Sequence, residues 1–198
     1  MILQAKNQLT VQEFLNLPPG EGDITYELVD GQAIPKISPK FFHAKLTRVL
    51  LNLIEKSCEG KGEVCPEWSI ALTRRGQDWM PIPDILYISY ESLPSNWDEN
   101  EACPVPPDLV IEIISPGQSF GQMAAKAKNY LDAKVLRVWV VDSKVRSITV
   151  FYPDAAPQTY MGDELLTDSL FEGLEFTVEQ VFQKARIPLN AAIPSPKP

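Results

Sequence analysis

Residues 107–116 form the stretch Pro107-Pro-Asp-Leu-Val-Ile-Glu-Ile-Ile-Ser-Pro116, a run of β-branched and apolar residues interrupted by the carboxylate of Glu112. The run predicts a β-strand. Side chains two positions apart point to the same face of a strand, so Val110 and Ile114 share the face of Glu112, and the opposite face is also mostly apolar. Such a strand belongs inside a sheet covered by helices. An ionised Glu112 there needs a metal, a cation or hydrogen bonds, and it belongs either to a structural ion pair or to a functional site.

The composition is that of an ordinary globular protein. Of the 198 residues, 44% are hydrophobic and 22% are charged, which suits one domain with a sizeable core. The first residues lack the basic segment and the long apolar stretch of a signal peptide, and no apolar run approaches membrane-spanning length. We therefore expect a cytoplasmic protein. The three cysteines have no C-x-x-C spacing, so the sequence indicates neither a disulfide framework nor a zinc site.

Charge is distributed unevenly along the chain. The net charge of −8 argues against a general nucleic-acid coat protein. Residues 36–75 nevertheless contain eight lysines and arginines against four glutamates, and residues 147–183 contain seven acidic residues and no lysine or arginine. A locally basic face on an acidic protein is one interpretation of this pattern, and solvated surface charge is the other.

Short-range patterns predict the elements around the central strand. Thr10 and Glu13 have the spacing of a capping box at the start of a short helix. The pair Asp30-Gly31, between two alternating runs, predicts a hairpin over residues 26–35. The other expected elements are a helix over 41–58, a hairpin of strands over 64–73 and 80–89, a helix over 119–133, strands over 136–142, 147–152 and 158–160, and a last helix over 177–185. With no internal repeat and no linker between two cores, we expect one domain over residues 1–187 and a proline-rich tail over 188–198.

Two Pro-Asp pairs supply candidate partners for Glu112. Asp108 shares its face but stands four residues away along the same strand, about 13 Å at the usual rise, which is too far to share one metal. Asp84 comes from another expected strand. If that strand lies beside the central one, the spacing of about 4.8 Å between neighbouring strands brings the carboxylates of Asp84 and Glu112 within reach of a common ion. Two hard oxygen ligands with room for water suit Mg²⁺ or Mn²⁺.

Two predicted helices bring further polar side chains to the sheet. On the helix over 41–58, His43 extends the apolar stripe and therefore faces the sheet, where a histidine with a structural role and a catalytic histidine are both consistent with the pattern. On the helix over 119–133, Lys126 and Lys128 lie on opposite borders of a stripe that includes Tyr130. Either lysine could reach over the sheet.

Taken in order, these motifs resemble the Uma-two (Uma2) family of putative restriction endonucleases, within the PD-(D/E)XK phosphodiesterase superfamily. The resemblance covers roughly residues 10–176. It rests on Tyr26-Glu-Leu-Val-Asp-Gly31, His43, Pro83-Asp84, the stretch 107–116, Lys126 with Tyr130, and Val138-Trp-Val-Val-Asp142. It implies an α/β (α+β) fold with a restriction-endonuclease-like core, in which a central mixed sheet is flanked by helices.

The resemblance also implies a site. Asp84 and Glu112 would hold Mg²⁺ or Mn²⁺, and Glu27 would be a further acid beside them. Ile114 occupies the position of the superfamily's lysine, and Lys126 matches a lysine that has moved to the following helix. Arg137 stands where the family more often has an acidic residue. The expected accessory residues are His43, Tyr130 and Lys128.

These observations lead to three hypotheses. The first is a metal-dependent, endonuclease-like phosphodiesterase that hydrolyses DNA, with Asp84, Glu112, Lys126 and Glu27 as catalytic residues and a homodimer as the family-level expectation. The second is a catalytically silent nuclease-fold protein with a binding or regulatory role, favoured by the acidic pI of about 4.7 and by the lack of a recognisable DNA-reading module. The third, a glycosidase that uses Asp84 and Glu112 as acid and base, fits poorly because no aromatic sugar platform is indicated.

Overall fold

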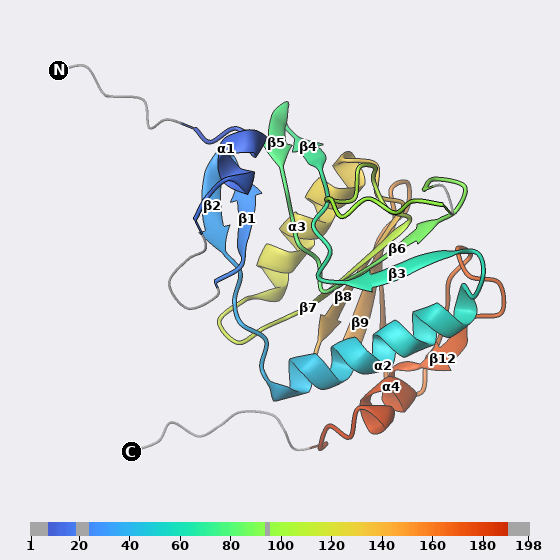
Figure 1. Cartoon of the computed structure of the whole chain (residues 1–198). Coiled ribbons are helices and arrows are strands. Elements are labelled where there is room, and N and C mark those ends of the chain that lie inside the picture. Colours follow the sequence, from blue (N-terminus) through green and yellow to red (C-terminus); the bar gives the residue numbers. More distant parts are fainter. Residues whose placement is uncertain (1–7, 19–23, 94–95, 190–198) are drawn as a thin grey trace, which may run out of the picture.

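The centre of the molecule is a six-stranded mixed sheet, seen in a computed structural model that describes residues 8–18, 24–93 and 96–189 (Figure 1). Its strand order is β10-β9-β8-β7-β6-β3. Strand β7 pairs with β8 in parallel, and the other pairs are antiparallel. The strands are β3 (Gly62–Pro66), β6 (Ile85–Ser89), β7 (Leu109–Ile113), β8 (Arg137–Asp142), β9 (Ser147–Phe151) and β10 (Gln158–Met161). The predicted central mixed sheet is confirmed.

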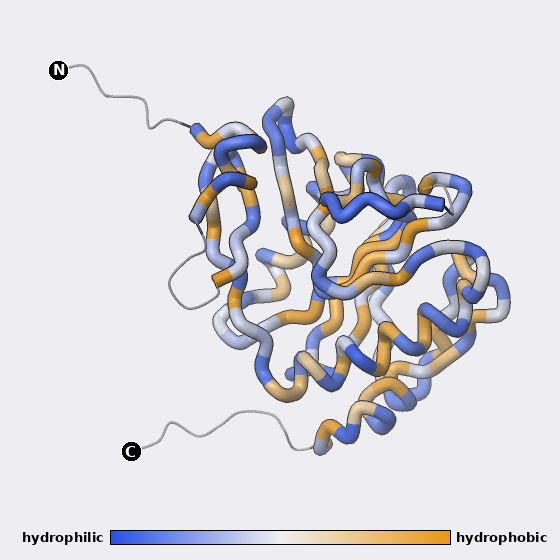
Figure 2. The backbone as a smooth tube through the Cα atoms, viewed as in Figure 1, coloured by the Kyte–Doolittle hydropathy of each residue, from blue (hydrophilic) through white to orange (hydrophobic). Residues whose placement is uncertain are grey.

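Helices cover both faces of this sheet. Helices α2 (Phe41–Ser57) and α4 (Val178–Lys184) lie together on one face, and α3 (Phe120–Asp132) lies on the other (Figure 1). The strands of the sheet are predominantly hydrophobic, whereas hydropathy alternates along the helices (Figure 2). The central strand β7 is buried on both faces, as its sequence predicts.

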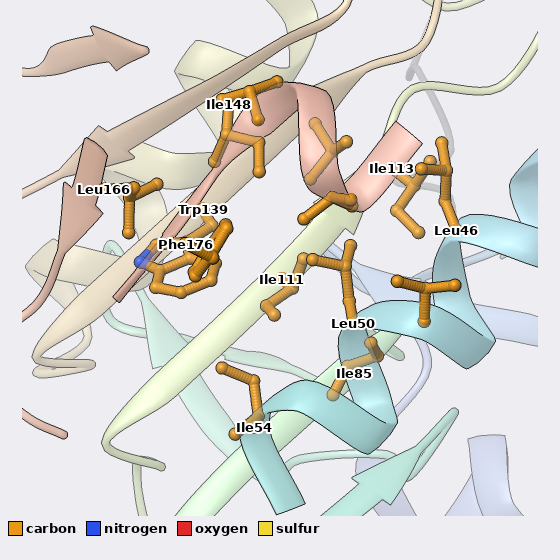
Figure 3. Close-up of a cluster of buried hydrophobic side chains, with 14 of the residues drawn as sticks. Leu46, Leu50, Ile54, Ile85, Ile111, Ile113, Trp139, Ile148, Leu166 and Phe176 are labelled. Atoms are coloured by element: carbon orange, nitrogen blue, oxygen red, sulfur yellow. The ribbon is translucent and has the colours of Figure 1, made fainter. Parts of the chain in front are cut away.

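The alternation of β7 divides its side chains between two cores. Ile111 and Ile113 pack with Leu46 and Leu50 of α2 (Figure 3). Val110 belongs to the second core, which lies under α3. Glu112 therefore has the α3 side of the sheet as its surroundings, and any compensating group must come from α3 or from the ends of neighbouring strands.

The helices begin where their capping residues stand. Ser119, Thr177 and Thr10 each form a complete capping box at the start of α3, α4 and α1 (Val11–Leu15), respectively. The box at Thr10 is the one predicted from sequence. Helix α2 instead derives its stability from its buried apolar stripe, which includes His43.

An N-terminal hairpin docks against the main body. Strands β1 (Tyr26–Val29) and β2 (Gln32–Pro35) pair as predicted, and the turn residues Asp30 and Gly31 have φ values of 51° and 71°. Positive φ at both central positions characterises the primed turns that match the twist of a hairpin. Leu28 and Met80 exchange two backbone hydrogen bonds of 3.2 and 3.0 Å, which fix the position of β1.

The predicted hairpin of two continuous strands over 64–73 and 80–89 is wrong in detail. Within these two segments, only the parts that form β3 and β6 pair in the main sheet, with Val64 opposite Tyr87. The intervening strands β4 (Leu72–Arg74) and β5 (Gln77–Trp79) form a separate two-stranded sheet. Pro81 and Pro83 lack the amide hydrogen that a ladder requires, which ends β5 before β6 can begin.

A third two-stranded sheet was not predicted. Strands β11 (Leu165–Thr167) and β12 (Glu175–Thr177) pair antiparallel ahead of α4. Strands of three residues are too short to show a clear alternation. None of the helices in the described parts of the chain is long and apolar enough to cross a bilayer. Residues 190–198 of the predicted tail lie outside the described residues, and the domain boundary at residue 187 stays a prediction.

Arg137 forms a buried ion pair, which gives a structural reason for a basic residue at this position. Its Nε lies 3.0 Å from both carboxylate oxygens of Asp168. The Trp139 indole also donates to Asp168, at 3.2 Å. The Asp168 side chain is fully buried, and the Arg137 guanidinium stacks on Tyr152 at 4.5 Å from the ring centroid. The pair ties β8 to the segment that follows β11.

Asp168→Ala should lower the free energy of unfolding by about 3–5 kcal/mol, because it leaves a buried guanidinium without a counter-charge. Urea denaturation followed by circular dichroism measures the change. Glu172→Ala is the control, because its ion pair with Lys61 is exposed and contributes little. Equal effects of the two substitutions would show that burial of the Arg137–Asp168 pair does not govern its contribution.

Candidate active site

A cavity of about 270 Å³ lies where the hairpin β1–β2, the start of α2, the carboxyl end of β7 and helix α3 meet. Its chemically active lining residues come from six different elements or their ends: Glu27, Lys36, His43, Asp84, Glu112 and Lys126. The structure thus brings Asp84, Glu112, Glu27, Lys126 and His43, all singled out from sequence, to one cavity.

The pairing of β6 with β7 places Asp84 beside Glu112. The two strands are antiparallel with Ile85 opposite Ile111, so the residue before Ile85 faces the residue after Ile111. The strand adjacency on which the sequence argument depended is therefore present. Both carboxylates are almost fully buried, with exposed fractions of 4% for Asp84 and 5% for Glu112.

Asp84 is surrounded by donors. Its Oδ2 accepts a hydrogen bond of 2.7 Å from the Ile113 amide and lies 3.0 Å from His43 Nε2. Its Oδ1 lies 3.3 Å from Lys36 Nζ. Burial acts to raise the pKa of Asp84, but His43, Lys36 and the Ile113 amide together hold it below the ordinary value. Asp84 is therefore ionised and oriented.

Glu112 is in the opposite electrostatic situation. Its Oε1 accepts a hydrogen bond of 2.8 Å from the Tyr130 hydroxyl and lies 2.9 Å from Lys126 Nζ. Burial raises the pKa of Glu112 above the ordinary value, and the attraction of Lys126 offsets this only in part. No described residue donates a hydrogen bond to Oε2. The negative charge of Glu112 is thus incompletely compensated, and Glu112 lines the cavity.

Lys126 links two of the three carboxylates. Its Nζ lies 2.9 Å from Glu27 Oε1 and 2.9 Å from Glu112 Oε1. Burial acts to lower the pKa of Lys126, but the charges of Glu112 and Glu27 outweigh it and raise the pKa above the usual range, so the ammonium stays charged. Lys128 is different: its side chain is 75% exposed and pairs with Asp132 of its own helix. The structure therefore separates two lysines that helical periodicity left equivalent.

Glu27 connects the hairpin to the site. Its Oε1 accepts a hydrogen bond of 2.8 Å from the Ile82 amide as well as the one from Lys126. The side chain therefore holds Lys126 in place and fastens β1 to the segment before β6.

His43 has a partner at each ring nitrogen. Nε2 faces Asp84, and Nδ1 lies 3.4 Å from the Thr47 hydroxyl one turn along α2. This arrangement orients Asp84. Asp108, by contrast, accepts a hydrogen bond of 2.6 Å from the Ser89 amide and does not line the cavity. Its exclusion agrees with the expected separation along β7.

Lys36 is a site residue that the sequence analysis missed. It follows β2, its side chain is 16% exposed, and its Nζ lies between Asp84 and Glu67 at 3.3 and 3.2 Å. Its place in the basic segment 36–75 was the only signal in the sequence. That segment does not indicate which of its cations faces the sheet, because the docking of the hairpin decides it.

The cavity has a small formal excess of negative charge. Three carboxylates, from Glu27, Asp84 and Glu112, face two ammonium groups, from Lys36 and Lys126, which leaves one negative charge. Within the described parts of the chain no three His, Cys, Asp or Glu side chains are grouped to hold a metal. Asp84 and Glu112 are the carboxylates that could take part in holding Mg²⁺ or Mn²⁺, because such ions accept one or two carboxylates and keep water or phosphate oxygens.

Comparisons with known proteins show the family and the fold. The family model Uma2, described as "Putative restriction endonuclease", matches residues 11–179. The crystal structure of a putative nuclease belonging to DUF820 from Anabaena variabilis is similar, with a TM-score of 0.78 and 22% sequence identity over 89% of this chain and 99% of that chain. At this identity the likeness shows the fold alone. No curated protein matches the chain.

In the presence of a chelator, Glu112→Gln should raise the free energy of unfolding relative to the wild type, increasingly so as the pH rises above the ordinary value of 4.5. The folded state raises the pKa of Glu112, so it binds this proton more tightly than the unfolded chain, and the wild type loses stability as the pH rises through that range. An amide does not ionise. Urea denaturation of both proteins between pH 4.5 and 8 measures the difference, and a difference independent of pH would contradict the prediction.

Proposed function

Because the chain belongs to the Uma2 family of putative restriction endonucleases and has a nuclease-like fold, we propose that it is a metal-dependent endonuclease that hydrolyses phosphodiester bonds in DNA. One observation carries the proposal. Asp84 and Glu112 are buried side by side on adjacent strands and face the same cavity as the ammonium of Lys126. A structural ion pair would not need a second carboxylate beside the first or an opening to solvent.

The two strand carboxylates are the proposed ligands of Mg²⁺ or Mn²⁺. Glu112 offers Oε2, and Asp84 is held ionised by its neighbours. A divalent ion bound there would polarise the scissile phosphate and lower the pKa of an attacking water. The hydrogen bonds from Tyr130 and from the Ile113 amide keep the two carboxylates in fixed orientations before any ligand arrives.

Lys126 is the proposed counterpart of the superfamily lysine. An ammonium group has three N–H donors, and the contacts of Lys126 with Glu27 and Glu112 engage two of them. The third remains for a phosphate oxygen, where it would stabilise the negative charge that develops during hydrolysis. Glu27 acts through Lys126 and is a positioning residue.

Lys36 would supply a second positive charge. It lies beside Asp84 near the surface of the cavity, where its exposed partner Glu67 holds it only weakly. An incoming phosphate competes well with such a partner, so Lys36 would help to admit an anionic backbone to a site that contains three carboxylates.

The alternative is a nuclease-fold protein that binds without cleaving. The lysines beside the carboxylates favour it, because Lys126 and Lys36 already neutralise much of the charge that would attract a metal. The homodimer and the cytoplasmic location expected from sequence stay predictions.

The proposal predicts nicking of plasmid DNA with Mg²⁺ or Mn²⁺ and none with chelator. Asp84→Asn should reduce the rate by orders of magnitude and weaken metal binding in a calorimetric titration, because it removes a ligand charge. Asp108→Asn is the matched control on the same pair of strands and should retain the activity. Wild-type protein that binds DNA but cleaves none with either metal would support the silent alternative.

Lys126→Ala should slow single-turnover cleavage by about 10²–10³-fold, as expected for loss of one donor to a developing oxyanion. Metal affinity should be retained or rise, because a competing cation has been removed. Lys128→Ala changes a solvent-exposed lysine of the same helix and should leave the single-turnover rate unchanged. The opposite ranking of the two variants would assign the catalytic charge to Lys128.

A further inference from the structure

We propose that a hollow beside the catalytic cavity receives one unstacked nucleobase of the substrate, with Phe41 as its stacking surface. The inference rests on the proposed nuclease function and goes beyond it, because it assigns a preference for single-stranded over duplex DNA.

The hollow lies next to the catalytic cavity and shares one wall residue with it. It has a volume of about 280 Å³ and lies between the start of α2 and the carboxyl ends of β7 and β8. His43 lines both spaces. Its other walls are mainly apolar and include Phe41, Phe42, Ile114 and Pro116. Sites for drug-sized ligands begin at roughly 300 Å³, so this space suits a single ring system attached to a ligand held next door.

Phe41 is exposed in a way that the fold does not require. Its side chain is 71% exposed although it is the first residue of α2, whereas the neighbouring Phe42 packs against the core. An exposed aromatic ring at the edge of an apolar hollow offers contact area to a ligand. The next turn of α2 contributes Leu46 to the core, so the helix does not depend on Phe41 for its packing.

The charges around Phe41 favour a nucleotide over an uncharged aromatic ligand. Lys45 Nζ lies 4.7 Å from the ring centroid of Phe41 and donates a hydrogen bond of 3.2 Å to the Arg186 carbonyl, which fixes its position. Lys40 lines the hollow, and the first turn of α2 contains no acidic residue. A nucleotide presents an aromatic face and an anionic backbone, and an aromatic ring flanked by cations complements both.

Occupation of this hollow constrains the DNA. A base in a duplex is stacked between its neighbours and cannot enter a space beside the backbone unless it is unstacked or flipped. Single-stranded DNA presents its bases without that cost. If the scissile phosphate occupies the catalytic cavity, a base of an adjoining nucleotide lies within reach of Phe41, since His43 belongs to both walls.

Binding is measured with chelator present, by fluorescence anisotropy of one labelled oligonucleotide offered single-stranded or as a duplex. Wild type should bind the single strand more tightly. Phe41→Ala should weaken single-strand binding about tenfold, a loss of about 1.4 kcal/mol that lies within the range for one stacked base, and should leave duplex binding unchanged. Phe41→Tyr should restore wild-type affinity. Leu165→Ala, which removes a 53% exposed apolar side chain from β11, is the control and should have no effect.

The outcomes distinguish this inference from the proposed function. Wild-type affinity in Phe41→Ala, equal losses on single-stranded and duplex DNA, or tighter binding of the duplex by wild type would each overturn the stacking site. Plasmid nicking by the wild type would leave the nuclease function standing in those cases. A wild type that neither binds the oligonucleotide nor nicks plasmid would overturn both.

Discussion

The buried carboxylate of Glu112 needs positive charge close to it, and several otherwise unrelated parts of the fold supply that charge. Its position in β7 keeps it almost fully buried, and α3 brings Tyr130 and Lys126 to its Oε1. Lys126 is itself buried and needs a second carboxylate, which Glu27 provides. Glu27 reaches the site only because the hairpin β1–β2 docks through the Leu28–Met80 bridge and the Ile82 amide. A requirement of the central strand thus extends to an N-terminal hairpin more than 70 residues earlier in the sequence.

This arrangement places two lysines among the carboxylates that include the proposed metal ligands. A cavity with three uncompensated carboxylates would oppose folding, since each buried charge loses its hydration. The two lysines offset this unfavourable burial of negative charge in the absence of a metal. They would also compete with a metal for the carboxylates. Burial still raises the pKa of Glu112, so the lysines compensate its charge only in part. Residual negative charge of this kind is a common property of functional sites, where stability is lower than packing alone would allow.

Alternation was sufficient to predict β7 and its burial, because these depend on residues close in sequence. Strand spacing placed Asp84 beside Glu112 only on the condition that their strands pair, and the structure supplies that pairing. Periodicity could not separate Lys126 from Lys128, since both border the same stripe and the positions of Glu27 and Glu112 distinguish them. Lys36 escaped notice for the same reason: the docking of the hairpin is a long-range event. The break between β5 and β6 could have been foreseen from Pro81 and Pro83, whereas the three-residue strands β11 and β12 carry too little pattern.

The acidic net charge says less about DNA binding than its size suggests. Part of the negative charge of the acidic segment 147–183 is neutralised within the protein, because Asp168 pairs with Arg137 and Glu179 with Arg146. At physiological ionic strength exposed charges farther apart than about 8 Å are largely screened, so a phosphate at the cavity responds to nearby groups rather than to the whole protein. The nearby groups include Lys36 and Lys126 and, at the start of α2, Lys40 and Lys45. Whether the site binds a nucleic-acid backbone is therefore decided by the balance between its lysines and its three carboxylates, and a divalent ion shifts that balance in favour of the phosphate.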